Sequence, residues 1–454
     1  MQFADDTNGL LANALSIYHL IALFQRYEEG TGAKIAIHKT RGIALNHPEG
    51  RPLCPDIEIK WNKKDTKILG VIFVPDLDES RNLNWERLCT TIEAKTKSLS
   101  QRKLSYKGKA TLLNSLILSK AWHVGRVFSP PKRWLSRIEK AVFHHFWKGS
   151  TETVARQTLK RPINKGGINI LPIFQQCAAL QIKDLWRIKL EEKPPWIFFG
   201  IYWLIDRLRS LFPELLKLAT NTPKHVIGPK PRHHSDILLS LGLAQGELSN
   251  SQVVSTRKIR MSLAKISEEP DGLIKAKRNL RDEIAQTLNW KALNLSSHNG
   301  AFPAKHGDIR FLLSHDALLT RARLARWYNW TPIQSRCPRC TSPETSVHVF
   351  KCRKLKPLYN LAYKTLQPIL KRDTTLTELL FGELKQPLAQ SLITELFHQI
   401  WRARCEIVFE QKHTPLDAIF FRALYHVELA LKVMPNTQPY ICEIYNGARI
   451  STGI

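Results

Sequence analysis

Three cysteines and one histidine in the second half of the chain have the spacing of a metal site. Cys337, Cys340, His348 and Cys352 form the pattern C-x2-C-x7-H-x3-C. The first pair can form a metal-gripping knuckle, and the last two residues would share one face of a helix. Three thiolates and an imidazole suit a closed, structural Zn²⁺ site, and in a reducing compartment this spacing favours metal over a disulfide. The alternative is a set of buried free cysteines beside an unrelated histidine.

Two adjacent aspartates near the first residue, Asp5 and Asp6, could hold divalent ions. They follow Phe3 and Ala4 between apolar segments, which suits a tight β-hairpin with carboxylates at its tip. Nucleotidyl transfer uses carboxylates in this way to hold two metal ions, which lower the barrier electrostatically. Taken alone, the pair is more typical of a solvated turn, so its meaning depends on the residues that follow.

A cationic block with interleaved aromatic side chains spans residues 95–150. It contains thirteen Lys and Arg residues and one acid, Glu139. The block predicts sequence-independent contact with the phosphates of a nucleic-acid duplex, and we assign Arg102, Lys103, Lys107 and Lys109 to this contact. The alternative is a helical bundle with a solvated cationic face.

The charge of the whole chain predicts a polyanionic partner. Its 454 residues include 68 Lys and Arg against 39 Asp and Glu, which gives a net charge of +29. No lipidation motif or basic amphipathic anchor stands out, so RNA and DNA are favoured over a membrane. No apolar run reaches bilayer length and no signal-peptide order begins the chain, so we expect an intracellular, nuclear protein. A helical scaffold for an acidic protein is a further alternative.

Periodicity and breakers predict a mostly helical chain with a few short strands near its start. Gly30 and Gly32 should stop the first helix. The predicted helices cover residues 10–29, 84–99, 106–122, 132–147, 388–411 and 416–433, and the predicted strands cover residues 34–37, 57–61 and 67–74.

The order of motifs in the first 80 residues resembles the late palm motifs of reverse transcriptases from non-LTR (LINE-type) retrotransposons. The matching stretches are an [FY]-x-D-D hairpin at residues 3–6, a G-x-K-I…K-T segment at 32–40 and an L-G-V hairpin at 69–71. Ala36 stands where this family more often has asparagine.

The resemblance implies roles for single residues. Asp5 would be a metal ligand with Asp6 as its hairpin neighbour, Lys39 would lie near the incoming triphosphate, and Gly70 would approach the primer strand. Mg²⁺ would be the catalytic ion of the complete polymerase. Only four residues precede Asp5, and no residue matches the family's other metal-binding aspartate. We therefore expect that this chain does not polymerise alone.

Later segments resemble the same family. The run L-S-Y-K-G-K-A at residues 104–110, the prolines at 130–131 followed by F-H-H-F-W at 143–147, and G-G-I at 166–168 match its thumb. The arginine-rich stretch at 310–326, the Cys/His pattern and I-W-R-A-R at 400–404 match its zinc-binding segment and helical tail. The implied task of the zinc segment is to hold Arg336, Arg339, Lys351 and Arg353 near RNA or target DNA.

The predicted fold is mostly α with a small β component. It comprises an incomplete reverse-transcriptase palm at residues 1–80, a helical thumb at 81–150, a connecting region at 151–300, a small zinc-binding segment at 301–360 and a helical tail at 361–454. The predicted function is a C-terminal fragment of an RNA-directed DNA polymerase that binds primer–template duplex or element RNA. The alternative is a non-enzymatic, zinc-containing nucleic-acid-binding module or a degenerate remnant.

Overall fold

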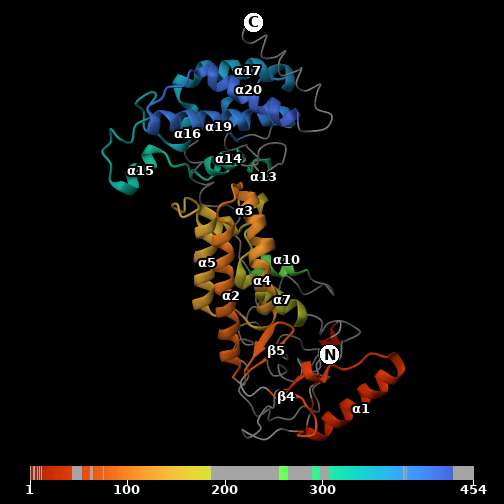
Figure 1. Cartoon of the computed structure of the whole chain (residues 1–454). Helices are drawn as coiled ribbons and strands as arrows, with labels where there is room; N and C mark the ends of the chain where they lie inside the picture. The colour runs from red at the N-terminus through yellow and green to blue at the C-terminus, as the bar shows by residue number, and fades with distance from the viewer. Residues whose placement is uncertain are drawn as a thin grey trace, which may run out of the picture. The chain divides into compact units, whose positions relative to one another are not determined.

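The computed structural model is mostly helical with a few short strands, which confirms the predicted fold class at this level (Figure 1). Within the part of the chain that it describes, no helix combines the length and apolarity needed to cross a bilayer. The described residues are 2–3, 6–7, 9, 11, 13–42, 54–61, 65–74, 76–185, 255–263, 289–296, 306–381, 384 and 386–432.

The chain divides into two compact units. Unit 1 comprises Met1–Ala94, Lys120–Ile138 and Ile173–Leu263, and unit 2 comprises Lys95–Ser119, Glu139–Pro172 and Ala264–Ile454. These units cut across the five segments expected from the sequence, whose boundaries stay predictions.

The strands of unit 1 are short and form three separate pairs. β1 (Gln2–Phe3) and β2 (Asp6–Thr7) are antiparallel, β3 (Arg41–Gly42) and β4 (Lys60–Trp61) are parallel, and β5 (Thr66–Ile68) and β6 (Val71–Phe73) are antiparallel. The single strand predicted at residues 67–74 is thus divided into two, with a hairpin turn in the L-G-V segment at residues 69–71. Its turn places Leu69 at φ 47° and Gly70 at φ 88°, and the left-handed backbone at the second position explains the glycine.

The first helix, α1, spans Ala14–Thr31. The Asn13 side chain caps its start by accepting from the Ser16 N–H, and the Gly32 N–H closes its end by donating to the Glu28 carbonyl. Gly30 lies inside the helix. The strand predicted at residues 34–37 is wrong: the N–H groups of Lys39 and Thr40 both donate to the Ala36 carbonyl and form the 3₁₀ turn η1 (Ile37–Lys39) instead.

Of the helices predicted in the basic block, the one at 132–147 is present with its predicted bounds and the one at 84–99 begins earlier. α2 spans Leu77–Leu99, and α5 spans Lys132–Trp147 directly after Pro130 and Pro131. The helix predicted at 106–122 is divided into α3 (Tyr106–Leu112), a π-helical segment η2 (Leu113–Leu118) and α4 (Ser119–Val127).

Buried polar contacts hold the helices of unit 1 together. The fully buried Trp85 on α2 donates its Nε1–H to the Phe128 carbonyl at 3.0 Å. Gln181, on α7 (Ile173–Leu185), donates to the Gly125 carbonyl of α4 at 2.8 Å. On α10 (Thr256–Leu263), Arg260 donates to the Gln176 side chain of α7 at 2.6 Å.

Unit 2 contains most of the shorter helices and the two long C-terminal ones. α19 and α20 contact each other and confirm the two helices predicted at 388–411 and 416–433 (Figure 1). Besides α3 and η2, its described helices include α6 (Arg156–Lys160), η3 (Ile163–Lys165), α13 (Trp290–Ser296), α14 (Gly307–Ser314), α15 (Arg321–Tyr328), α16 (Ser346–Lys351), η6 (Arg353–Leu355), α17 (Lys356–Leu370), α18 (Leu376–Phe381), α19 (Pro387–Glu410) and α20 (Leu416–Lys432).

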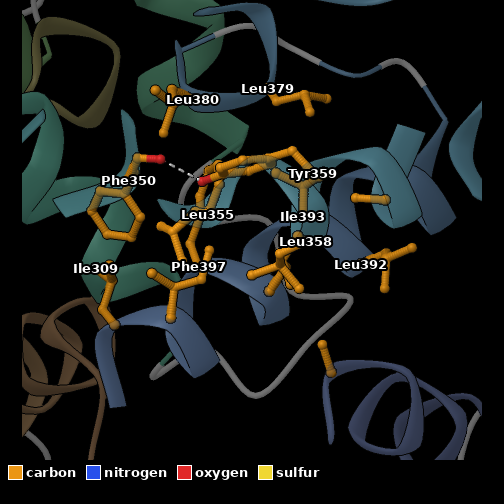
Figure 2. Close-up of a cluster of buried hydrophobic side chains, with 14 of the residues drawn as sticks. Ile309, Phe350, Leu355, Leu358, Tyr359, Leu379, Leu380, Leu392, Ile393 and Phe397 are labelled. Atoms are coloured by element: carbon orange, nitrogen blue, oxygen red, sulfur yellow. Dashed lines mark hydrogen bonds between the residues drawn. The ribbon is translucent and has the colours of Figure 1, made fainter. Parts of the chain in front are cut away.

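A hydrophobic core lies in the part of this unit between Leu293 and Val427, and Figure 2 shows some of its residues. Phe350 on α16 packs against Phe397 on α19 with ring centroids 5.2 Å apart, and the Tyr359 hydroxyl on α17 donates to the Phe350 carbonyl at 2.8 Å. The core also contains Cys337, Cys340 and Cys352. The cysteine segment and the helical tail are therefore parts of one packed body.

Candidate metal centre

The four residues of the predicted metal site converge in unit 2. The Sγ atoms of Cys337, Cys340 and Cys352 and a ring nitrogen of His348 all lie within 4.8 Å of one another. The three cysteines are at most 5% exposed, and His348 is partly exposed. This arrangement could hold a metal ion such as Zn²⁺, for which three thiolates and an imidazole are a complete tetrahedral set.

A short β-type turn positions the first two cysteines. Arg336 and Pro343 form a β-bridge, inside which the Cys337 N–H donates to the Ser342 carbonyl at 2.7 Å. The Arg339 N–H lies 3.4 Å from Cys337 Sγ. A backbone N–H aimed at a sulfur stabilises the thiolate form, as the groups around metal ligands commonly do.

The start of α16 positions the histidine. The Thr345 hydroxyl accepts from the His348 N–H at 3.1 Å and caps the helix, so the imidazole lies in its first turn. His348 Nε2 is 3.1 Å from Cys340 Sγ. Cys352 follows the last residue of α16 in extended backbone, so the two ligands do not lie on one helix as predicted, although they still converge.

Within the cluster, the pKa values of Cys352 and Cys340 are shifted in opposite directions. Burial raises the pKa of Cys352 to about 12. Burial also opposes ionisation of Cys340, but hydrogen bonds from the backbone and side chain of Ser342 outweigh it and lower that pKa. A bound divalent cation would supply the charge that keeps such buried sulfurs deprotonated.

A buried ion pair connects the metal segment to α19. Glu344 is fully buried, accepts from Arg404 Nε at 3.0 Å and accepts from the Arg321 N–H at 2.7 Å. The Arg404 side chain is 2% exposed. Because a carboxylate and a guanidinium at this depth must compensate each other, the pair fixes the start of α15 and the metal segment to one point on α19.

An exposed aromatic surface lies at the end of α15, next to the metal segment in sequence. We call Trp327, Tyr328 and Trp330 the aromatic platform; they are 41%, 63% and 38% exposed. The rings of Tyr328 and Trp330 are stacked at a centroid distance of 6.1 Å and an interplanar angle of 27°. Arg326 and Arg336 nearby in sequence are also exposed. Sequence reasoning missed this surface, although the run W-Y-N-W at residues 327–330 was its signal.

The residues predicted to act in polymerisation all belong to unit 1. Phe3 pairs with Asp6 across β1 and β2, which agrees with the predicted hairpin, but Asp5 and the side chain of Asp6 lie outside the described residues. Lys39 is exposed at the end of η1. Gly70 lies in an exposed turn whose Leu69 carbonyl is 2.7 Å from His123 Nε2. Their roles stay predictions.

The basic residues assigned to nucleic acid separate into two kinds. Arg102, Lys103 and Lys107 are exposed. Lys109 is a correction, because its side chain is 7% exposed and its ammonium donates to the Phe146 carbonyl at 2.6 Å. This cation is used inside the fold and not on a phosphate.

The four cations predicted around the metal segment also separate into two exposed side chains and two that form hydrogen bonds within unit 2. Arg336 and Arg353 are exposed. Arg339 donates to the Ile400 carbonyl at 3.3 Å, and Lys351 donates to the Thr377 hydroxyl at 3.0 Å, so these two bind within the unit.

The chain matches no family model. It is similar to an uncharacterized 149 kDa protein of transposon TX1 from Xenopus laevis, with 23% identity over 198 residues. The matched stretch covers 43% of the chain and 15% of the Xenopus protein.

Proposed function

We propose that the chain is the C-terminal part of an RNA-directed DNA polymerase from a LINE-type retrotransposon. In this proposal it binds primer–template duplex or element RNA and does not polymerise by itself. The motif order near the first residue, the similarity to a transposon protein and the net charge of +29 support it. The second candidate is a non-enzymatic, metal-containing nucleic-acid-binding module or a degenerate remnant of such an element.

The observation that carries nucleic-acid binding is the aromatic platform, which lies next in sequence to the candidate metal segment. Soluble proteins rarely expose three neighbouring aromatic rings without a use for them. Bases of single-stranded RNA or DNA stack on such rings, and neighbouring arginines contact the phosphates. Arg326 and Arg336 are exposed and could contact the phosphates.

Rigidity of the platform supports the same role. Its helix α15 begins at the Arg321 N–H that donates to Glu344, and Glu344 is held by Arg404 of α19. After α15, the Trp330 N–H donates to the Ala325 carbonyl at 3.0 Å and turns the chain back on the helix end. The rings are thus presented on ordered backbone, which lowers the entropic cost of stacking.

The exposed cations of the basic block would bind a different part of the ligand. Arg102 and Lys103 lie between α2 and α3, and Lys107 lies on the first turn of α3. Contacts from such side chains to phosphates depend steeply on salt and little on sequence. In this proposal the basic block contacts the phosphates of a duplex, and the aromatic platform stacks on the bases of a single strand.

Replacing Trp327 and Trp330 with alanine tests the proposal. Each lost stacking contact should weaken binding of single-stranded RNA by roughly 5- to 150-fold, with little change in salt dependence, because phosphate contacts remain. The measurement is fluorescence anisotropy of a labelled RNA oligonucleotide at several salt concentrations.

The matched control is Tyr425→Ala, which removes an aromatic ring of 58% exposure from α20. Equal affinity of the control and the platform variants would contradict the proposed interface. Binding of polyglutamate as tightly as RNA would favour a scaffold for acidic proteins instead.

The two candidate functions differ in what the genomic DNA encodes upstream of Met1. An in-frame palm strand with a metal-binding aspartate supports the polymerase. In-frame stop codons support the non-enzymatic module or remnant.

A further inference from the structure

A second cluster of metal-binding side chains lies elsewhere in unit 2. Ligand atoms of His306, Glu395 and His398 all lie within 4.8 Å of one another. Glu395 and His398 are one turn apart on α19, and His306 precedes the first residue of α14. The cluster shares no residue with the cysteine site.

The centre of this cluster is a buried carboxylate. The Glu395 side chain is fully buried, and its ion-pair partners among the described residues are all histidines: His306, His398 at 3.7 Å and His426 at 3.8 Å. Gln399 donates to Glu395 Oε1 at 2.7 Å and fixes the orientation of the carboxylate.

The two nearest imidazoles lie almost parallel beside this carboxylate. The rings of His306 and His398 are stacked with centroids 3.7 Å apart and an interplanar angle of 13°. His306 Nδ1 contacts Glu395 Oε2. The buried Nδ1 of His398 has no hydrogen-bond partner. Buried polar nitrogens in proteins nearly always have a partner, so an unpartnered one indicates a place for a ligand.

We infer that His306, Glu395 and His398 bind a divalent transition metal ion such as Zn²⁺. Two imidazoles and a carboxylate are a donor set that holds zinc with a further coordination position. The ion would accept the lone pair of His398 Nδ1 and neutralise the buried Glu395 carboxylate. His426 on α20 is the nearest candidate for a fourth ligand, since its Nδ1 lies 3.8 Å from Glu395 Oε1.

Such an ion would join three helices of one body. His306 belongs to the start of α14, Glu395 and His398 to α19, and His426 to α20. α19 also carries Arg404, which holds the cysteine segment. The second ion would therefore stabilise the same body that the first stabilises, by a different set of ligands.

Cobalt titration of the full chain separates the two sites, because only thiolate ligands give an intense near-ultraviolet charge-transfer band. The wild-type chain should bind about two Co²⁺ ions, one of them with this band. Glu395→Gln and His398→Asn should each bind about one ion with the band intact. Cys340→Ser should bind about one ion without the band. The control is His413→Asn, an exposed histidine between α19 and α20, which should behave as the wild type.

The intact band in the Glu395 and His398 variants also reports that unit 2 is folded. A wild-type chain that binds one ion, together with a Cys340→Ser chain that binds none, would overturn the second site whatever the other variants do. The same conclusion follows if Glu395→Gln and His398→Asn both bind as many ions as the wild type.

Discussion

At the scale of single residues, Lys107 and Lys109 show how two equal side chains in one motif differ in role. Both belong to the same basic run, yet Lys107 is exposed, whereas the Lys109 nitrogen lies over the rings of Tyr106 and Phe146, 5.3 and 5.4 Å from their centroids. Charge counts cannot separate them. Only the packing of Phe146 against Tyr106 of α3 decides that Lys109 is buried.

The cysteine ligands give a prediction at the same scale. Cys340→Ser should lower the metal content by about one ion per chain, because an alcohol is a poor ligand for zinc and the remaining three residues do not close the site. Metal content is measured by mass spectrometry after dialysis against a weak chelator.

The control is Cys405→Ser, which changes a partly buried cysteine outside the cluster. If metal content is the same in both variants and the wild type, the four residues are not the ligands.

At the scale of elements, helix starts and interruptions depart most from sequence expectation. α2 begins seven residues before its predicted start, because Asp76 caps it by accepting from the N–H groups of Asp78 and Glu79. Its first turn is exposed and so lacks the apolar periodicity that marks a helix in sequence.

The π-helical segment η2 has a tertiary cause. Asn114 donates to the Asn169 carbonyl at 2.8 Å and accepts from the Leu171 N–H at 3.0 Å. The wide turn lets this side chain pair with a segment more than fifty residues away, which no local pattern reveals.

The link between the metal segment and α19 gives a prediction at this scale. Glu344→Gln should destabilise the chain by roughly 3–5 kcal/mol, because Arg404 would be left as an uncompensated buried charge. Chemical denaturation followed by tryptophan fluorescence measures the loss.

The control is Glu410→Gln, an exposed acid at the end of the same helix, which should change stability little. Pairing Glu344→Gln with Arg404→Met removes both charges and should restore part of the loss. A Glu344→Gln chain as stable as the control would show that the pair does not hold the two elements together.

At the scale of the whole molecule, the excess of 29 positive charges and the division into two units are the main facts. Unit 1 contains every residue predicted to act in polymerisation, and unit 2 contains the cysteine cluster, the aromatic platform and the Glu395 cluster. The proposed catalytic and nucleic-acid-anchoring parts are therefore separate bodies of one chain.

For the whole molecule, we predict that these 454 residues do not polymerise DNA by themselves. The purified chain should not extend an annealed DNA primer on an RNA template with Mg²⁺ or Mn²⁺, because a two-metal site needs more carboxylates than Asp5 and Asp6. Incorporation of labelled nucleotide is the readout. Extension by the wild-type chain that is lost in Asp5→Asn would contradict this expectation and at the same time assign the catalytic carboxylate.

The sequence by itself determined the features that arise within a few turns of chain. Cysteine and histidine spacing placed the metal cluster and periodicity placed α19 and α20, because ligand geometry and the helix repeat act over short separations. The β5–β6 hairpin was expected only from the resemblance of residues 69–71 to a family motif. Tertiary structure alone decided the contacts between distant segments. Residues 306, 395 and 426 meet only because α14, α19 and α20 share one core, and Lys109 is withdrawn from the surface only because Phe146 packs above it. Burial is a property of the assembled body, so no local pattern could have assigned it.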